Sequence, residues 1–352
     1  MSMQAEQHMY QQGVQHLCDN GLTQVPNKYI LPEPERPLNV VDDGCINLPI
    51  IDFAQLQGEN RPRVLASLSK ACQEFGFFQF KVEVKLCELW MWMQVINHGL
   101  GDEAIGKMID VSKRFFELPF EERQRYMSSD LHAPVRYGTS FNQNNDKVFC
   151  WRDFLKLSCH SMQDYSSLWP SSPLDLREAM GVYSTKTQHL YERVMEAILE
   201  SLGVTNETAI FEQGSQLMMV NWYPACPQPQ LTLGLPPHSD YGLLTLLLQD
   251  QVEGLQIQHN DKWVTVKPIP NSFVVNIGDQ FEIFSNGRYK SVVHRVAVNS
   301  MRSRLSVASL HSLNANYNVT PSPILIDDSN PRLYQDTNYA DFVDYLSSSD
   351  FK

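Results

Sequence analysis

The chain has 352 residues, of which 43% are hydrophobic and 19% charged, a composition typical of globular proteins that bury a sizeable core. Its 28 basic and 40 acidic side chains give a formal net charge of −12, and so negative a surface repels phosphate backbones, which excludes nucleic acid as an expected partner. The seven cysteines form no C-x-x-C pair and no apolar run could span a bilayer, which argues against a disulfide framework, a cysteine zinc site and membrane contact.

The N-terminal half is predicted to be mainly helical. Residues 1–47 form an arm that lacks the apolar stretch of a secretory signal, and its proline-rich part, 25–37, favours an extended path into the fold. Apolar residues at helical spacing predict helices over 61–75, 102–118 and 174–202. Gly76 and Gly203 follow the first and last of these, and Pro119 stops the second. We assign residues 48–205 to this N-terminal region.

From Gln216 onward, short β-rich runs separated by turn residues replace the helical periodicity. The runs that predict strands are 217–223, 243–249, 254–259, 263–266, 272–277, 289–298 and 304–310. The dipeptide Asn286-Gly287 stands between two of them and predicts a hairpin. The pattern indicates a mainly β fold with α: a distorted double-stranded β-helix (jelly roll) over residues 206–315, with the helical region packed on it and 316–352 as a C-terminal segment.

Three residues of this half could bind a metal. In an extended segment, His238 and Asp240 would point to the same face, and His294 lies in a later predicted strand. Two imidazoles and one carboxylate on one side of an ion leave the other side open, an arrangement that suits non-haem Fe(II) and O₂ chemistry. A lone His-x-Asp also occurs by chance, and a single strand histidine is more often packed and hydrogen-bonded than a ligand.

Arg304 and Ser306 follow the His294 run and share one face of a predicted strand. A buried arginine is costly unless it meets an anion, and its guanidinium can hold a carboxylate through two parallel hydrogen bonds. The pair therefore predicts a receptor for the far carboxylate of a dicarboxylic acid, with an internal Arg–Asp or Arg–Glu pair as the alternative. Tyr223 could add a hydroxyl to the same carboxylate or be an ordinary buried tyrosine.

In order and spacing these residues resemble the plant 2-oxoglutarate-dependent dioxygenases, nearest to the downy-mildew-resistance-6-like and flavanone 3-hydroxylase-like oxygenases. The resemblance rests on Leu48–Asp52 (LPIID), Phe75–Gln79 (FGFFQ), Val95–Gly99 (VINHG), Phe115–Pro119 (FFELP), Trp151–Leu155 (WRDFL), Pro224–Pro227 (PACP), His238–Gly242 (HSDYG), Asn276–Asp279 (NIGD), Ser285–Arg288 (SNGR), His294–Val296 (HRV) and Arg304–Ala308 (RLSVA).

The resemblance implies an enzyme in which His238, Asp240 and His294 bind Fe(II), while Arg304, Ser306 and Tyr223 bind 2-oxoglutarate. Members use O₂ to cleave 2-oxoglutarate to succinate and CO₂ as they hydroxylate or desaturate a substrate, and ascorbate is the expected reductant. It gives His98 and Asp279 structural roles. The expected substrate-pocket residues are Phe141, Asn142, Lys156 and Leu310, the last at a position where the family more often has phenylalanine.

Fifteen residues, Phe80 to Gln94 (FKVEVKLCELWMWMQ), interrupt a stretch that is continuous in this family. So apolar a surface segment is unusual in a soluble monomer. It could be in-frame sequence from an unremoved intron, a β-hairpin extension or a partner-binding segment. We favour the first interpretation, because both flanks join without a gap when it is deleted.

The sequence thus predicts a monomeric oxygenase of the cytoplasm, with the nucleus as a second location, that acts on a small phenolic or flavonoid plant metabolite. A gibberellin-type terpenoid acid is the alternative substrate. Two other functions stay open: a jelly-roll relative made catalytically incompetent by the insertion, and a zinc enzyme on a similar barrel, which would not need the Arg304 clamp.

Overall fold

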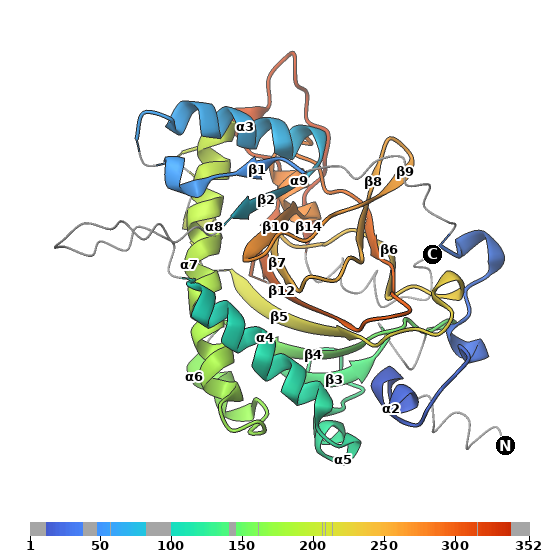
Figure 1. Ribbon diagram of the computed structural model, residues 1–352. Helices are drawn as coiled ribbons and strands as arrows, with labels where there is room; N and C mark the ends of the chain where they lie inside the picture. The colour runs from blue at the N-terminus through green and yellow to red at the C-terminus, as the bar shows by residue number, and fades with distance from the viewer. Residues whose placement is uncertain are drawn as a thin grey trace.

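Two facing β-sheets form the centre of the computed structural model, which describes residues 12–37, 48–56, 58–81, 100–140, 146–160, 162–205, 207, 209–212, 214–314 and 316–338 (Figure 1). The large sheet has eight strands in the order β1 (Ile50–Ile51), β2 (Phe77–Lys81), β10 (Ser272–Ile277), β7 (Leu244–Gln249), β12 (Arg304–Ser312), β5 (Ser215–Tyr223), β4 (Asp153–Ser158) and β3 (Val135–Thr139). The small sheet has the order β6 (Leu235–His238), β11 (His294–Val296), β8 (Leu255–His259) and β9 (Lys262–Thr265). The fold is mainly β, as predicted.

Three helices cover the outer face of the large sheet: α3 (Arg61–Glu74), α4 (Asp102–Glu117) and α7 (Leu176–Leu202). Figure 1 shows the long helix α7 beside the sheet, where it contacts the central strands β7 and β12, and both α3 and α4 pack against α7. All three predicted helices are confirmed, although α7 begins two residues after the predicted start at 174. Gly76 (φ 60°) and Gly203 (φ 80°) adopt the left-handed conformation that ends a helix. None of the helices in the described ranges is long and apolar enough to cross a membrane.

Shorter elements complete the described chain. They are α2 (Val14–Asp19), η1 (Asn27–Tyr29), η2 (Glu33–Glu35), η3 (Phe53–Leu56), α5 (Phe120–Arg123), η4 (Gln124–Tyr126), α6 (Met162–Tyr165), η5 (Ser166–Leu168), α8 (Ala209–Glu212), η6 (Pro229–Leu231), α9 (Asp279–Phe284), β13 (Asn318–Val319), η7 (Pro323–Leu325) and β14 (Thr337–Asn338). The proline-rich arm is therefore not simply extended, because it contains two 3₁₀ turns. The predicted division at residues 47, 205 and 315 stays a prediction.

Successive residues along the strands of the large sheet face two different environments. On β12, Leu305 and Val307 are buried among the apolar side chains under the helices, and His311 stacks on Tyr191 of α7 with ring centroids 4.1 Å apart. The other residues of β12, beginning with Arg304 and Ser306, point to the opposite, inner face of the sheet. This inner face is directed at the small sheet. The core therefore lies between the large sheet and the helices, and the inner face is left for polar groups.

The structure corrects the region before His294. A hairpin was expected at Asn286-Gly287, with a strand over 289–298, but α9 precedes the dipeptide and the strand is limited to β11. Asn286 (φ 51°) and Gly287 (φ 74°) do adopt left-handed conformations. They close the helix end instead, because the Gly287 amide donates to the Glu282 carbonyl (2.9 Å). Asp279, which was expected to have a structural role, is the first residue of α9.

Candidate metal centre

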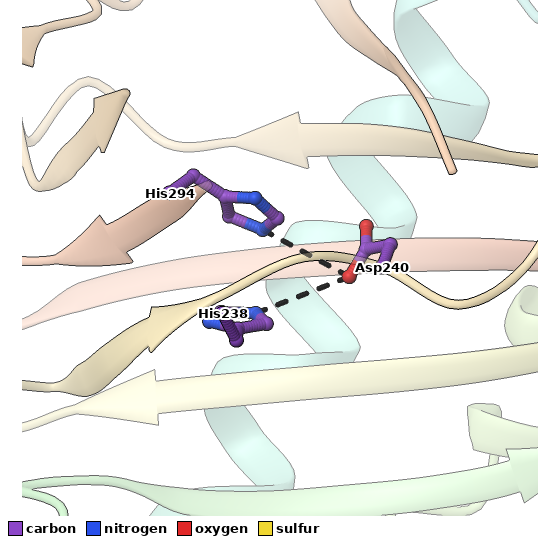
Figure 2. A group of neighbouring side chains, drawn as sticks. All are labelled: His238, Asp240 and His294. Atoms are coloured by element: carbon purple, nitrogen blue, oxygen red, sulfur yellow. Dashed lines mark ion pairs between the residues drawn. The ribbon is translucent and has the colours of Figure 1, made fainter. Parts of the chain in front are cut away.

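His238, Asp240 and His294 come together on the small sheet. His238 ends β6 and lies opposite His294, the first residue of β11, with ring centroids 4.2 Å apart. One potential ligand atom from each of the three residues lies within 4.8 Å of the others. Figure 2 shows both Nε2 atoms directed at Asp240 Oδ1, at 3.9 Å from His238 and 3.8 Å from His294. The structure brings the three predicted residues together, although Asp240 lies beyond the end of β6, so strand alternation does not explain its position.

Hydrogen bonds hold each of these side chains in its orientation. His238 Nδ1 donates to the Pro236 carbonyl (2.8 Å) and His294 Nδ1 to the Val292 carbonyl (3.2 Å), which leaves both Nε2 atoms as acceptors. Asp240 Oδ2 accepts from two side chains, Thr245 Oγ1 (2.6 Å) and Asn276 Nδ2 (2.7 Å). The other carboxylate oxygen, Oδ1, thus faces the histidines as a metal ligand would.

The protonation states of His238 and Asp240 also favour the binding of a cation. Burial, together with the neighbouring His294, lowers the pKa of His238 to about 4, so this imidazole is neutral at pH 7. Burial alone would raise the pKa of Asp240, but the two histidines and the bonds from Thr245 and Asn276 outweigh it and the net shift is downward. Neutral imidazole and ionised carboxylate are the forms that bind a divalent ion.

Arg304 lies on the inner face of β12 with only 2% of its surface exposed. Its Nε donates to the Val252 carbonyl (3.2 Å) and its Nη2 to Gln249 Oε1 (2.8 Å), while Nη1 is buried without a hydrogen-bond partner. No ion pair found among the described residues involves Arg304, so the alternative of an internal acidic partner is not observed there. A desolvated cation with an unused donor fits an external carboxylate.

Tyr223, Ser306 and two glycines lie around Arg304. Tyr223 lies directly opposite on β5, its ring centroid 5.1 Å from the guanidinium carbon, and Ser306 follows on the same face of β12. A Cβ added to Gly254 would lie 2.8 Å from Arg304 Cδ, and one added to Gly234 would lie 2.5 Å from Tyr223 Cδ1. Both positions therefore need glycine, because any side chain would displace the clamp.

Two of the four predicted pocket residues, Lys156 and Leu310, lie on described strands. Phe141 and Asn142 lie outside the described residues, as do His98 and the insertion from residue 82 onward. Lys156 and Leu310 are on the inner face of the large sheet. Their cross-strand partners Met219 and Leu217 are four and six residues before Tyr223 on β5 and therefore share its face. Their role in binding a substrate stays a prediction.

Sequence reasoning missed three residues that orient the site: Thr245, Gln249 and Asn276. Each stands on the inner face of an otherwise apolar strand and is no more than 6% exposed. Polar residues within buried runs such as Leu244–Gln249 are a usable signal, because a buried polar group needs a partner.

Residues 214–312 match the 2OG-Fe(II) oxygenase superfamily, and residues 48–83 and 84–172 match the non-haem dioxygenase in morphine synthesis N-terminal family, with the break inside the predicted insertion. Protein DMR6-LIKE OXYGENASE 1 from Arabidopsis thaliana is 41% identical over 86% of this chain and 84% of its own length. Flavanone 3-dioxygenase 2 from Oryza sativa subsp. japonica is 39% identical over 90% of this chain and 89% of its own. The crystal structure of JOX2 in complex with 2OG, Fe and JA superimposes with a TM-score of 0.82 at 33% identity, covering 96% of this chain and 93% of that one.

Proposed function

The chain belongs to the 2OG-Fe(II) oxygenase superfamily, and on that premise we propose that it hydroxylates or desaturates a small, largely apolar plant metabolite, phenolic or flavonoid, with release of succinate and CO₂. It is an oxidoreductase of the dioxygenase type. The substrate class is the part that is proposed, since substrate loops vary freely around a fixed core.

One observation carries the proposal: a buried arginine with an unused donor stands on the sheet that faces the three metal-binding side chains. Among the described residues Arg304 Nη1 has no hydrogen-bond partner, and the metal-facing Oδ1 of Asp240 lies 3.9 and 3.8 Å from the Nε2 atoms of His238 and His294. A metal alone would need the triad but not Arg304. A co-substrate with a carboxylate at each end needs both.

Each residue then has a defined task. His238, Asp240 and His294 would hold Fe(II), which together with 2-oxoglutarate and O₂ supplies the oxidising chemistry. Arg304 receives the far carboxylate of 2-oxoglutarate, with the hydroxyls of Ser306 and Tyr223 beside it. Phe77 packs against His294 in a T-shaped arrangement (centroids 5.4 Å apart) and so places an apolar ring beside that ligand.

The remaining expectations keep the status of proposals. We propose ascorbate as the reductant and a monomer as the working state. A gibberellin-type terpenoid acid is the alternative substrate. The insertion at 80–94 could make the chain catalytically incompetent, whereas the complete set of Fe(II) and 2-oxoglutarate residues supports a working site.

Succinate formation from 2-oxoglutarate tests the proposal. We expect turnover that requires both Fe(II) and O₂ and is abolished in His238→Ala. In Arg304→Ala the 2-oxoglutarate concentration for half-maximal rate should rise roughly 100-fold, because a buried charge-assisted contact is removed. Arg125→Met, which removes a charge from an exposed pair with Glu122, should leave both properties unchanged. Turnover without iron, or an unaffected Arg304→Ala, would contradict the assignment, and a zinc enzyme would not consume 2-oxoglutarate.

A further inference from the structure

The N-terminal arm is fastened to the large sheet by one buried carboxylate. The amides of Val14 and Gln15, the first two residues of α2, donate to Asp153 Oδ1 (2.7 Å) and Asp153 Oδ2 (2.9 Å). Asp153 is the first residue of β4 and is completely buried. We call this contact between Val14, Gln15 and Asp153 the arm lock.

The arm supplies hydrogen bonds that a buried carboxylate needs. Arg123 Nη1 lies 3.9 Å from Asp153 Oδ2, and the Tyr137 hydroxyl donates to the same oxygen (3.2 Å). Burial raises the pKa of Asp153, while Arg123 and the two arm amides oppose that rise. A buried carboxylate is costly unless it is paired and hydrogen-bonded, so the amides of Val14 and Gln15 help to hold Asp153 in its place.

Gln15 extends the arm lock from β4 to β5. Trp222 on β5 is the cross-strand partner of Asp153, and its Nε1 donates to the Gln15 side-chain oxygen. Gln15 therefore bonds to both members of this pair, to one through its amide and to the other through its side chain. The next residue on β5 is Tyr223, whose ring centroid lies 5.1 Å from the guanidinium carbon of Arg304. The arm thus holds β5 one residue before the clamp.

A second series of contacts runs from the arm through the residues that precede β4. Tyr29 of the arm packs against Trp151 in a T-shaped arrangement, with ring centroids 5.5 Å apart. Trp151 Nε1 donates to the carbonyl of Pro224 (3.0 Å), the residue after Tyr223. Cys150 belongs to one small buried apolar cluster with Tyr223. Residues 150 and 151 therefore connect the arm to Tyr223 and to its neighbour in the chain.

We propose that the arm lock is a positioning device for 2-oxoglutarate: by holding the ends of β4 and β5 it keeps Tyr223 beside Arg304, and so it sets the affinity for the co-substrate. This inference rests on the proposed function. His238 and His294 belong to the small sheet, whereas the arm lock acts on two strands of the large sheet. The affinity for Fe(II) should therefore not depend on the arm lock.

Two glycines of the arm provide a matched pair of variants. Gly13 (φ 89°) and Gly21 (φ 75°) both have left-handed backbone angles, so alanine strains the chain at either position. A Cβ added to Gly13 would lie 2.8 Å from each carboxylate oxygen of Asp153, whereas one added to Gly21 would meet nothing within 4 Å. Gly13→Ala therefore pushes the arm away from Asp153, and Gly21→Ala is the control that leaves the arm lock intact.

The test measures the dissociation constant of 2-oxoglutarate on the anaerobic, Fe(II)-loaded full chain, from its visible charge-transfer band and below the melting temperature of every variant. We expect Gly13→Ala to raise this constant about 10-fold without changing the Fe(II) dissociation constant, and Gly21→Ala to change neither. In a Tyr223→Phe background, Gly13→Ala should raise it less than about 3-fold, because the hydroxyl that the arm lock positions is already absent.

Hydrogen exchange separates positioning from a purely structural role. The amides of Val14 and Gln15 should exchange faster in Gly13→Ala than in Gly21→Ala, because they lose their acceptor on Asp153. Faster exchange with an unchanged 2-oxoglutarate dissociation constant would overturn the inference, and so would unchanged exchange, an equal weakening of Fe(II) binding, or the same effect without the Tyr223 hydroxyl. These results leave the oxygenase assignment intact, whereas absence of the band in the wild type would count against that assignment itself.

Discussion

At the scale of single residues, the residues that would bind metal and 2-oxoglutarate could be predicted from the sequence. The residues that orient them through hydrogen bonds could not. His238, Asp240, His294 and Arg304 are conspicuous because of residue type and spacing. The hydrogen bonds that orient Asp240 come from residues 5 and 36 positions away in the chain. Such partners are set by strand register, which no local pattern specifies.

The orienting bonds to Asp240 lead to a first prediction. Thr245→Val keeps the side-chain shape but removes the donor to Asp240 Oδ2, so the carboxylate can rotate away from the histidines. We expect Fe(II) affinity to fall by about 10- to 100-fold, the usual effect of removing such a partner. Thr265→Val on β9 is the matched control. Equal Fe(II) dissociation constants in wild type and Thr245→Val would show that the bond does not position the ligand.

Lys156 leads to a prediction of pH dependence. Burial, reinforced by Arg136 and opposed by Asp130, lowers the pKa of Lys156 to about 8. The Lys156 side chain is therefore positively charged at pH 7, and this charge is lost as the pH rises through about 8. Because Lys156 is a predicted pocket residue, substrate affinity should change above about pH 8, and Lys156→Arg should remove that change because arginine stays protonated. A substrate affinity that is the same at pH 7 and 9 in the wild type would argue against a role for Lys156.

At the scale of elements, periodicity located the helices well, and turn signals were less reliable. The three long helices have the predicted positions because each buries an apolar face and meets a glycine or proline at its end. Asn286-Gly287 indicated the correct backbone conformation but the wrong neighbours. A dipeptide specifies its own left-handed angles, and whether a helix or a strand precedes it depends on the packing of α9.

The insertion can be tested through the register of β2. Phe80 and Lys81 pair with Phe273 and Ser272 of β10, and deleting residues 80–94 would bring Val95 and Ile96 to those two positions. We expect the shortened chain to fold, to give more soluble protein and to bind Fe(II) and 2-oxoglutarate at least as tightly. Equal yield and equal activity in both forms would show that the insertion is tolerated. Loss of folding on deletion would show that it is an integral part of the protein.

At the scale of the whole molecule, the sequence was sufficient to predict the fold and the reaction class. The family match and the similar proteins agree with both predictions. The sequence did not reveal that Arg136 lies beside Lys156, because the two are distant in the chain and meet only through the pairing of β3 with β4. Two of the four residues expected in the pocket, Phe141 and Asn142, lie outside the described part of the structure. Substrate choice therefore depends on three-dimensional neighbours more than on motifs.

Stability of the metal-free protein should depend on pH through a buried histidine. His311 is 1% exposed between β12 and α7, and burial lowers its pKa to about 3. The unfolded chain takes up this proton near pH 6.5, so stability falls as the pH drops from about 6.5 toward 3. Each such group contributes up to about 1.4 kcal/mol per pH unit in that window. The free energy of unfolding, measured with urea, should differ less between pH 7 and pH 5 in His311→Phe than in the wild type. Identical differences would contradict this.

The central claim is that His238, Asp240, His294 and Arg304 together bind Fe(II) and 2-oxoglutarate. The most direct measurement is an anaerobic titration of the purified protein with Fe(II) and 2-oxoglutarate, following the visible charge-transfer band between iron and the keto acid. We predict a saturable band that is absent in His238→Ala and needs far more 2-oxoglutarate in Arg304→Ala. A well-folded protein that shows no band, or a band unaffected by both substitutions, would contradict the claim.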